Sequence, residues 1–254
     1  AVRAAKDILD TPEPGFRERK TSETVADRFR RIGVPFQDGI AITGLKGVLK
    51  GGGAGPTVAV MGELDSLIVQ GHPHADPVNS AAHACGHHCQ VAMMLGVAVG
   101  LMASGVLEAL SGRVALMAVP AEEFIDVEYR WDLHRERKLG LMAGKQELIR
   151  LGAFDDVDMA MMVHTSASPE DKSFSVGGTS NGHLVKYVRF IGKAAHAGGS
   201  PHRGINALQA ALVALNAVNA QRETFKSENT VRLHGILTAG GVAANSTPAD
   251  VRYE

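Results

Sequence analysis

Strand-length and helix-length apolar patterns alternate along the first two thirds of the chain. Strand patterns occur at residues 44–50, 57–65, 112–123 and 156–167, and helical spacing occurs at residues 20–33, 87–105 and 137–154. The runs within 112–123 and 156–167 are almost wholly apolar, which indicates strands buried on both sides. Strands that alternate with helices predict an α/β fold, with a mixed sheet covered by helices.

Two of the helical stretches carry further signals. In residues 20–33, Thr21 or Ser22 can cap the start, and Gly33 can end the helix because glycine readily adopts the left-handed conformation. The stretch 87–105 is long and apolar, with small residues on several sides, so we expect it to be buried.

The pattern changes near residue 180. A half-exposed strand is predicted within 182–197, an amphipathic helix within 204–221, and further strands within 229–241 and 248–254. This β-α-β-β order is typical of the start of a small α+β domain. We therefore expect two domains, 1–179 and 180–254, and expect the second to be truncated.

Composition narrows the class of partner and the compartment. The chain has 254 residues, with 26 basic and 27 acidic side chains and a net charge of −1. This balance gives no electrostatic support to nucleic-acid binding, and no apolar run approaches the roughly 20 residues of a membrane span. The chain has only two cysteines and no apolar signal segment at its start, so we expect a cytoplasmic protein.

Ionisable residues gather where predicted strands end and where the long helix begins. In open α/β sheets, ligands bind beyond the carboxyl ends of the strands, where helix N-termini also point. We therefore expect one crevice to collect side chains that lie far apart in the sequence. The candidates are Asp65, Cys85, His87, Glu122, Glu123 and His164.

These side chains suit a metal site. Thiolate, imidazole and carboxylate are the ligands that zinc prefers. Gly86 allows a turn that points Cys85 and His87 at one place, and a helix start favours the thiolate of Cys85. Of two adjacent glutamates, one can bind metal while the other takes a proton from water. An aspartate such as Asp65 can fix the tautomer of a ligand histidine.

The segment HACGHHCQ, residues 83–90, is also compatible with two roles that involve no metal. It can hold a redox dithiol, although Cys85 and Cys89 form a C-x-x-x-C spacing, one residue longer than the usual C-x-x-C. Cys89 is more simply a small buried residue. The segment can also be an ordinary helix start that happens to be polar.

Five motifs in this order resemble the metal-dependent amidohydrolases of the aminoacylase and glutamate-carboxypeptidase family. They are HACGH at 83–87, PAEE at 120–123, a strand that ends in His164, GKAAHA at 192–197 and HGILTAGGVAANSTP at 234–248. The subfamily with these motifs hydrolyses N-acyl amino acids, indole-acetyl-amino acids, hippurate and p-aminobenzoyl-glutamate. The resemblance implies a catalytic α/β domain with a two-metal site, and an inserted ferredoxin-like α+β domain that serves as lid and dimerisation surface.

The resemblance also implies a role for each matching residue. Glu122 matches the general base, and Asp65 an aspartate behind the ligands. In the lid, His196 matches a histidine that polarises the scissile carbonyl in the site of a second subunit, and Asn245 matches a substrate contact. The implied metal ligands, with the cysteine bridging two ions, are Cys85, His87, Glu123 and His164. The thiolate favours zinc, with manganese as the alternative.

The chain departs from the family pattern at several positions. His88 and Gln90 replace the Asp and the second His of H-A-C-G-H-D-x-H, and Glu63 replaces an Asp. Residues 124–140 replace a glycine-rich stretch and are expected to reshape the pocket rim. A last ligand histidine that follows the lid in the family has no counterpart here.

Together these features predict a homodimeric metallo-amidohydrolase. Its substrate is a small N-acyl amino acid, and its reaction is amide hydrolysis by a metal-activated water with Glu122 as the base. Two alternatives remain: a dipeptidase or carboxypeptidase of the same family, and a non-catalytic metal-binding relative.

Overall fold

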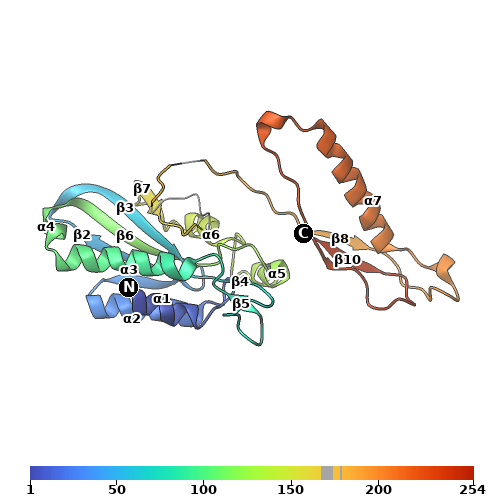
Figure 1. Ribbon diagram of the computed structural model, residues 1–254, viewed down its shortest axis with the longest axis horizontal. Coiled ribbons are helices and arrows are strands. Elements are labelled where there is room, and N and C mark those ends of the chain that lie inside the picture. Colours follow the sequence, from blue (N-terminus) through green and yellow to red (C-terminus); the bar gives the residue numbers. More distant parts are fainter. Residues whose placement is uncertain (167–173, 178) are drawn as a thin grey trace. The chain divides into compact units, whose positions relative to one another are not determined.

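The computed structural model describes residues 1–166, 174–177 and 179–254, so residue 167 of the predicted strand 156–167 lies outside the described residues. The chain divides into two compact units, Ala1–Ser173 and Phe174–Glu254 (Figure 1). Each unit is described by itself. Their roles as catalytic and lid domains stay predictions.

The first unit alternates helices and strands. Its helices in the described residues are α1 (Val2–Leu9), α2 (Arg19–Ile32), α3 (His87–Ala103), α4 (Val106–Ala109), α5 (Val127–Arg135) and α6 (Gly144–Arg150). Its strands are β1 (Phe36–Ile40), β2 (Gly44–Lys50), β3 (Gly53–Glu63), β4 (Leu67–Ile68), β5 (Ala81–Ala82), β6 (Ser111–Val119) and β7 (Met159–Met162).

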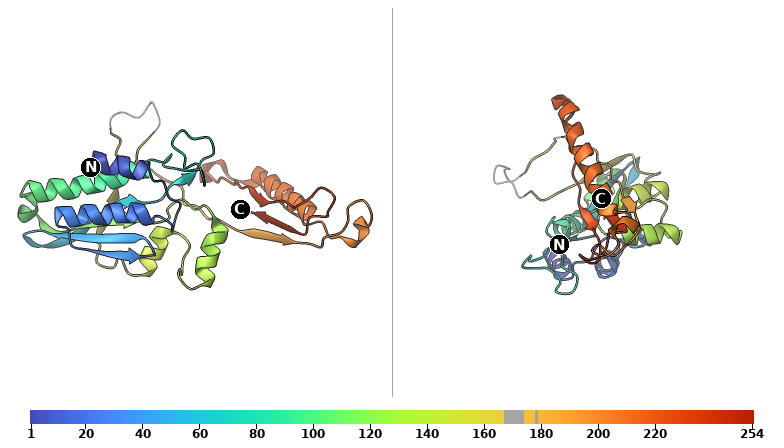
Figure 2. Two further views of the ribbon diagram at one scale, coloured as in Figure 1. Left: turned by 90° about the horizontal axis from the view of Figure 1, so that it is seen from below. Right: turned by 90° about the vertical axis from the view of Figure 1, so that its right-hand side faces the viewer.

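A mixed sheet with helices on both faces confirms the predicted α/β architecture of this unit. Its strand order is β1-β2-β6-β3-β7, with β3 parallel to β6 and β7, and β2 antiparallel to its neighbours. α1, α2 and α3 bury the larger core against one face, where they lie together in Figures 1 and 2. Leu148 of α6 packs against Ala115 and Met117 on the other face.

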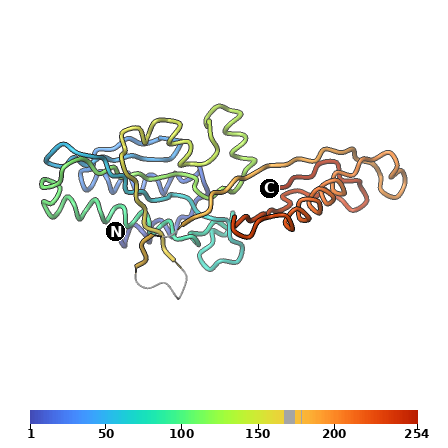
Figure 3. Tube along the Cα trace, turned by 90° about the horizontal axis from the view of Figure 1, so that it is seen from above, coloured from blue at the N-terminus to red at the C-terminus, as the bar shows by residue number. Residues whose placement is uncertain are grey.

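The register of the parallel strands brings their carboxyl ends to one edge. Glu63 at the end of β3 pairs with Val119 at the end of β6, and Met61 pairs with Met162 at the end of β7. α3 starts at the same edge because it packs closely on β3, where a Cβ on Gly62 would lie 3.0 Å from the backbone of Val91. Figure 3 traces this path by colour, from β3 through α3 to β6.

The predicted cap of α2 is wrong, but its predicted end is confirmed. Glu18 occupies the N-cap position and makes no side-chain cap bond. The backbone N–H and the hydroxyl of Thr21 instead donate to Oε2 of Glu13 at 2.9 and 3.0 Å, so a carboxylate from the preceding loop satisfies the helix start. Gly33 ends the helix in the left-handed conformation, with φ of 77°.

The prediction that the strand within 156–167 is buried is also wrong. All four residues of β7 are exposed, although they are apolar. Among the described residues β7 pairs with β3 alone, so it lies at the edge of the sheet with one side bonded.

The helix predicted over 137–154 is shorter in the structure, where α6 covers Gly144–Arg150. The carboxylate of Glu147 accepts backbone N–H groups from Gly140 and Leu141 at 3.0 and 2.7 Å. These bonds hold the preceding residues in a loop, which competes with extension of the helix toward its N-terminus.

The second unit is a small α+β unit with the predicted β-α-β-β order. It contains β8 (Val188–Ile191), α7 (Ala207–Ala220), β9 (Leu237–Ala239), β10 (Asp250–Tyr253) and short 3-10 helices at Pro201–Arg203, Gln221–Thr224 and Ser227–Asn229. The sheet order is β8-β10-β9, all antiparallel, and Ala207 and Ala211 of α7 pack against Val251. The strands are shorter than the alternating patterns predicted.

Within the described residues, no helix is both long enough and apolar enough to cross a bilayer.

Candidate metal centre

The turn before α3 presents two predicted ligands together. Gly86 precedes the helix with a φ of 96°, a conformation that side chains disfavour. A Cβ at this position would also lie 2.0 Å from Oγ1 of Thr165, whose hydroxyl donates to the backbone carbonyl of Cys85 at 3.3 Å. The proposed role of Gly86 as the turning point between Cys85 and His87 therefore has a direct structural reason.

One ring nitrogen of His87 is hydrogen-bonded, whereas the other has no hydrogen-bond partner among the described residues. Its Nδ1 lies 2.8 Å from the backbone carbonyl of Asp65, and a carbonyl can only accept, so Nδ1 carries a proton. Its Nε2, the bare nitrogen, is buried and has no hydrogen-bond partner within the described part of the chain. In the neutral imidazole this nitrogen has a free lone pair, which is the form that binds a metal.

Carboxylates surround this bare nitrogen. Nε2 of His87 lies 3.0 Å from Oε2 of Glu63, 3.9 Å from Oε2 of Glu122 and 3.9 Å from Oε1 of Glu123. The first contact lies within ion-pair distance but does not form a hydrogen bond. β3 and β6 thus deliver three glutamates to the start of α3.

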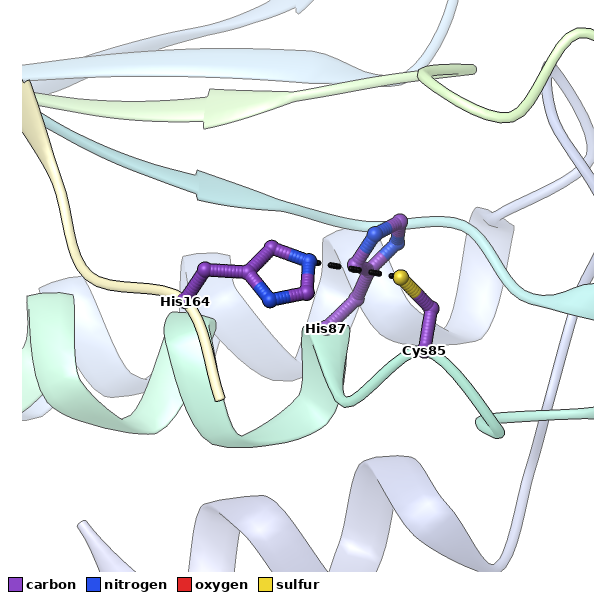
Figure 4. Close-up of side chains that lie close together, drawn as sticks. All are labelled: Cys85, His87 and His164. Atoms are coloured by element: carbon purple, nitrogen blue, oxygen red, sulfur yellow. Dashed lines mark hydrogen bonds between the residues drawn. The ribbon is translucent and has the colours of Figure 1, made fainter. Parts of the chain in front are cut away.

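His164 approaches from the end of β7. Its Nε2 lies 3.3 Å from Sγ of Cys85, and Figure 4 shows both side chains converging beside the ring of His87. Two groups of ligand atoms therefore meet at this edge, each with all atoms within 4.8 Å of one another. They are Cys85, His87 and His164, and Glu63, His87 and Glu122.

Asp65 lies behind these groups and contacts both His87 and the backbone of Glu123. Its Oδ2 accepts the backbone N–H of Glu123 at 2.9 Å, while Oδ1 is 3.4 Å from Nδ1 of His87. The backbone carbonyl of Asp65, rather than its carboxylate, makes the shorter contact that fixes the tautomer of His87. The carboxylate positions the glutamate pair.

The raised pKa values of the cluster indicate an excess of negative charge that a bound cation would balance. Burial lowers the pKa of His87, but the hydrogen bond and charge of Asp65 and the charge of Glu63 outweigh burial and raise it to about 9. Burial and the charges of Glu123 and Glu122 raise the pKa of the Cys85 thiol to about 12, which reverses the expected preference for thiolate. Burial also raises the pKa of Glu123. A divalent ion would replace these protons and compensate the carboxylates, so the donor set fits a metal.

Gln90 and Glu63 form a buried pair that the sequence pattern did not predict. Nε2 of Gln90 donates to Oε2 of Glu63 at 2.9 Å, and the backbone N–H of Glu63 donates to Oε1 of Gln90 at 3.2 Å. The longer carboxylate at position 63 and the amide at position 90 depart from the family pattern together. Their mutual bonds explain why the two departures are compatible.

The glutamate pair rests on a strained, tightly held loop. Ala121 has a φ of 48°, a conformation uncommon for non-glycine residues. Its N–H donates to Oε1 of Glu18 at 2.7 Å, and its carbonyl accepts from Gly144 and from Arg130 at 3.2 and 3.3 Å. These bonds hold the backbone that leads into Glu122.

Glu18 makes the stability of this region depend on pH. Its carboxyl is fully buried, and burial together with the charge of Asp65 raises its pKa to about 7. A carboxyl whose folded pKa lies above its unfolded value stabilises the protein fully below the unfolded pKa of 4.5 and loses this contribution as pH rises through 7. Glu18→Gln cannot ionise, so we expect its free energy of unfolding, relative to the parent, to rise between pH 5 and pH 8 by about 3 kcal/mol.

Denaturant unfolding of both proteins at the two pH values measures this difference. Glu108→Gln, which changes an exposed glutamate on α4, serves as the control and is expected to show no such trend. A difference between Glu18→Gln and the parent that stays constant with pH would contradict the assignment.

In the second unit, His196 and Asn245 lie close together. The N–H of Ala197 donates to the carbonyl of Asn245 at 2.9 Å, and His196 bridges to Ser246. Nδ1 of His196 accepts the N–H groups of Gly198 and Gly199 at 3.2 and 2.9 Å, so Nε2 carries the proton of the neutral ring. Both side chains are exposed.

Known proteins resemble the chain along most of its length. No family model matches it. Thermostable carboxypeptidase 1 of Saccharolobus solfataricus is 29% identical over 226 residues, 85% of this chain and 52% of the relative. The Xaa-Arg dipeptidase of Mus musculus is 32% identical over 178 residues, 68% of this chain and 35% of the relative. IAA-amino acid hydrolase ILR1-like 2 of Arabidopsis thaliana is 29% identical over 256 residues, 98% of this chain and 54% of the relative.

The chain belongs to the M20 family of metal-dependent amidohydrolases and peptidases. Two solved structures share the fold of this chain. The YXEP protein of Bacillus subtilis, a dinuclear metal binding peptidase from the M20 family, has a TM-score of 0.59 at 21% identity and covers 99% of this chain and 61% of its own. The aminobenzoyl-glutamate utilization protein of Klebsiella pneumoniae has a TM-score of 0.62 at 19% identity. The match covers 99% of this chain and 64% of that protein's chain. The chain spans about half the length of the carboxypeptidases that it matches.

Proposed function

We propose that the protein hydrolyses the amide bond of N-acyl amino acids with two divalent metal ions held at this centre. The observation that carries the proposal is the bare Nε2 of His87, which is buried among carboxylates and adjoins the contact between Cys85 and His164. IAA-amino acid hydrolases among the relatives support an acyl amino acid as substrate.

Each residue of the centre has a proposed task. Cys85, His87, Glu123 and His164 would hold the metal, with zinc favoured by the thiolate. When bound, the metal would supply a Lewis acid and lower the pKa of a bound water to about 7. Asp65 keeps the Glu123 backbone in place through the bond of 2.9 Å.

Glu122 is proposed as the general base and acid. It is the more exposed of the two glutamates, at 33% against 19%, so substrate can reach it. Its carboxylate takes a proton from water as the water oxygen bonds to the carbonyl carbon. It then gives that proton to the nitrogen as the C–N bond breaks, which releases the amino acid.

The second unit is proposed to serve as lid and dimerisation surface. The free Nε2–H of His196 suits a donor to the carbonyl oxygen of the substrate in a homodimer, and the exposed Asn245 suits a substrate contact.

A peptidase is the second candidate function. Carboxypeptidases and a dipeptidase among the relatives favour it. The same chemistry would then cut a peptide bond, so substrate choice alone separates the two candidates.

A substrate panel on the full-length protein tests the proposal. Chelated protein is assayed with N-acetyl and N-benzoyl amino acids and with dipeptides, before and after zinc or manganese is added. We expect metal to restore hydrolysis of the N-acyl amino acids. Hydrolysis of dipeptides alone would favour the peptidase, and stoichiometric metal without any hydrolysis would favour a non-catalytic metal-binding protein.

A further inference from the structure

The carboxylate of Glu122 has two charged neighbours within ion-pair distance among the described residues. Nζ of Lys145 lies 3.6 Å from its Oε1, and Nε2 of His87 lies 3.9 Å from its Oε2. In the proposed function Nε2 of His87 binds metal, so it has no proton to donate to a carboxylate. Of the two neighbours, only Lys145 can then attract Glu122 and hold it in place.

Lys145 is itself anchored by a buried carboxylate. Its ammonium forms an ion pair with Oε1 of Glu63, whose side chain is only 1% exposed. Oε2 of Glu63 accepts the amide of Gln90 at 2.9 Å, so this glutamate is bonded through both oxygens. An ammonium has three donors, so its contact with Glu63 leaves it able to attract a second carboxylate.

The backbone also fixes the position of Lys145. It follows Gly144, where a Cβ would lie 1.6 Å from the carbonyl oxygen of Pro120, and the N–H of Gly144 donates to the carbonyl of Ala121 at 3.2 Å. The start of α6 is therefore held against the loop that carries Glu122. Lys145 and Glu122 keep their relative positions because their backbones are bonded to each other's neighbours.

Glu122 needs such a partner because it lies at the rim of the site. Its side chain is 33% exposed, so packing alone leaves several side-chain rotamers open to it. A general base works only within hydrogen-bond reach of the proton that it takes. At 3.6 Å the lysine acts on Glu122 through its charge rather than through a hydrogen bond.

We propose that Lys145 is the positioning residue of the general base. Anchored on Glu63, its charge keeps the Glu122 carboxylate in one orientation within the site. The inference rests on the role of Glu122 in the proposed function. Lys145 acts through Glu122 and takes no proton itself.

A double-mutant cycle tests this role. Steady-state rates are measured for the zinc-loaded full-length protein, Lys145→Met, Glu122→Gln and the double variant, with the N-acetyl amino acid, N-benzoyl amino acid or dipeptide that the parent hydrolyses fastest. We expect Lys145→Met to lower kcat about 10- to 100-fold and to change KM by about twofold or less. In the Glu122→Gln background the same replacement should change kcat by about twofold or less, because no carboxylate remains to be positioned.

A merely structural role of Lys145 would give a different pattern. An unbalanced charge on buried Glu63 that disturbed the centre would lower the rate in both backgrounds and would release metal. Zinc per chain is therefore measured on every sample and is expected to match the parent. If Lys145→Met does not fold, Lys145→Gln, which keeps a polar side chain, takes its place in the cycle with the same expected result.

Two further variants complete the set. Lys145→Arg keeps the positive charge and is expected to retain kcat within about fivefold of the parent. Lys138→Met is the matched control, because Lys138 is 60% exposed and pairs with Glu136 outside the centre. Its kcat and KM should equal those of the parent.

The outcomes separate this inference from the proposed function. A Lys145→Met with the parent's kcat, or an equal loss of rate in both backgrounds, would overturn the role of Lys145 and leave the proposed function standing. Hydrolysis of dipeptides alone would overturn the proposed substrate, and the cycle measured on the dipeptide would still decide the role of Lys145. No hydrolysis of any substrate by the parent would overturn both.

Discussion

Glu122→Gln is expected to lose about 10²- to 10⁴-fold in kcat while it keeps its bound metal. The amide is similar in shape to the carboxylate but can neither accept the proton of water nor return it to the leaving amine. Glu122 does not lie in the group of Cys85, His87 and His164, so its replacement leaves those ligands in place. Steady-state rates with N-acyl amino acids and metal content per chain are measured on the same samples.

Glu123→Gln is compared with Glu122→Gln because the two glutamates are proposed to have different roles. This residue is proposed as a ligand, and the pKa of its carboxyl is raised by burial. Its replacement should lower the affinity for metal, whereas Glu122→Gln should not. Turnover by Glu122→Gln at the parent's rate would contradict the assignment of the base.

Arg130→Met is expected to cost about 4 kcal/mol in the free energy of unfolding. Arg130 is only 1% exposed, and its guanidinium donates to the carbonyls of Ile125, Ala121 and Met142 at 2.8, 3.3 and 2.7 Å and also to the carbonyl of Glu123. The methionine would leave these buried acceptors without their donor. It would also remove the positive charge that Arg130 places near the carboxylates of Asp65 and Glu18.

Arg135→Met on the same helix is the control for this measurement. The side chain of Arg135 is 63% exposed and pairs only locally with Asp132 among the described residues, so its loss should change stability by about 0.5 kcal/mol or less. Denaturant unfolding compares the two variants with the parent. An Arg130→Met midpoint equal to that of Arg135→Met would show that the buried guanidinium does not hold the loop.

The meeting of distant residues at one edge could be predicted from the sequence. Apolar runs that end in ionisable residues indicated strands whose carboxyl ends coincide, and the parallel pairing of β3 with β6 and β7 has this geometry. Cys85 and His164 accordingly lie in contact although 79 positions separate them. The metal and catalytic roles of these residues stay proposals.

Other parts of the centre could not be predicted from the sequence. Arg130 and Lys145 lie in a region of short helices and loops, and both interact with groups whose positions depend on the whole fold. Arg130 binds backbone carbonyls, which no side-chain pattern reveals. The exposed face of β7 was missed for a related reason, because an apolar run indicates a strand but does not show whether it lies at an edge.

Zinc K-edge X-ray absorption of the full-length protein tests the metal centre most directly. The parent, Cys85→Ser and Cys89→Ser form the set, since Cys89 contacts His88 and belongs to neither ligand group. We predict a sulfur ligand at about 2.3 Å and nitrogen or oxygen ligands at about 2.0–2.1 Å in the parent and in Cys89→Ser, with the sulfur lost in Cys85→Ser. A spectrum of the parent without sulfur, or a sulfur ligand that persists in Cys85→Ser, would contradict a metal bound by Cys85.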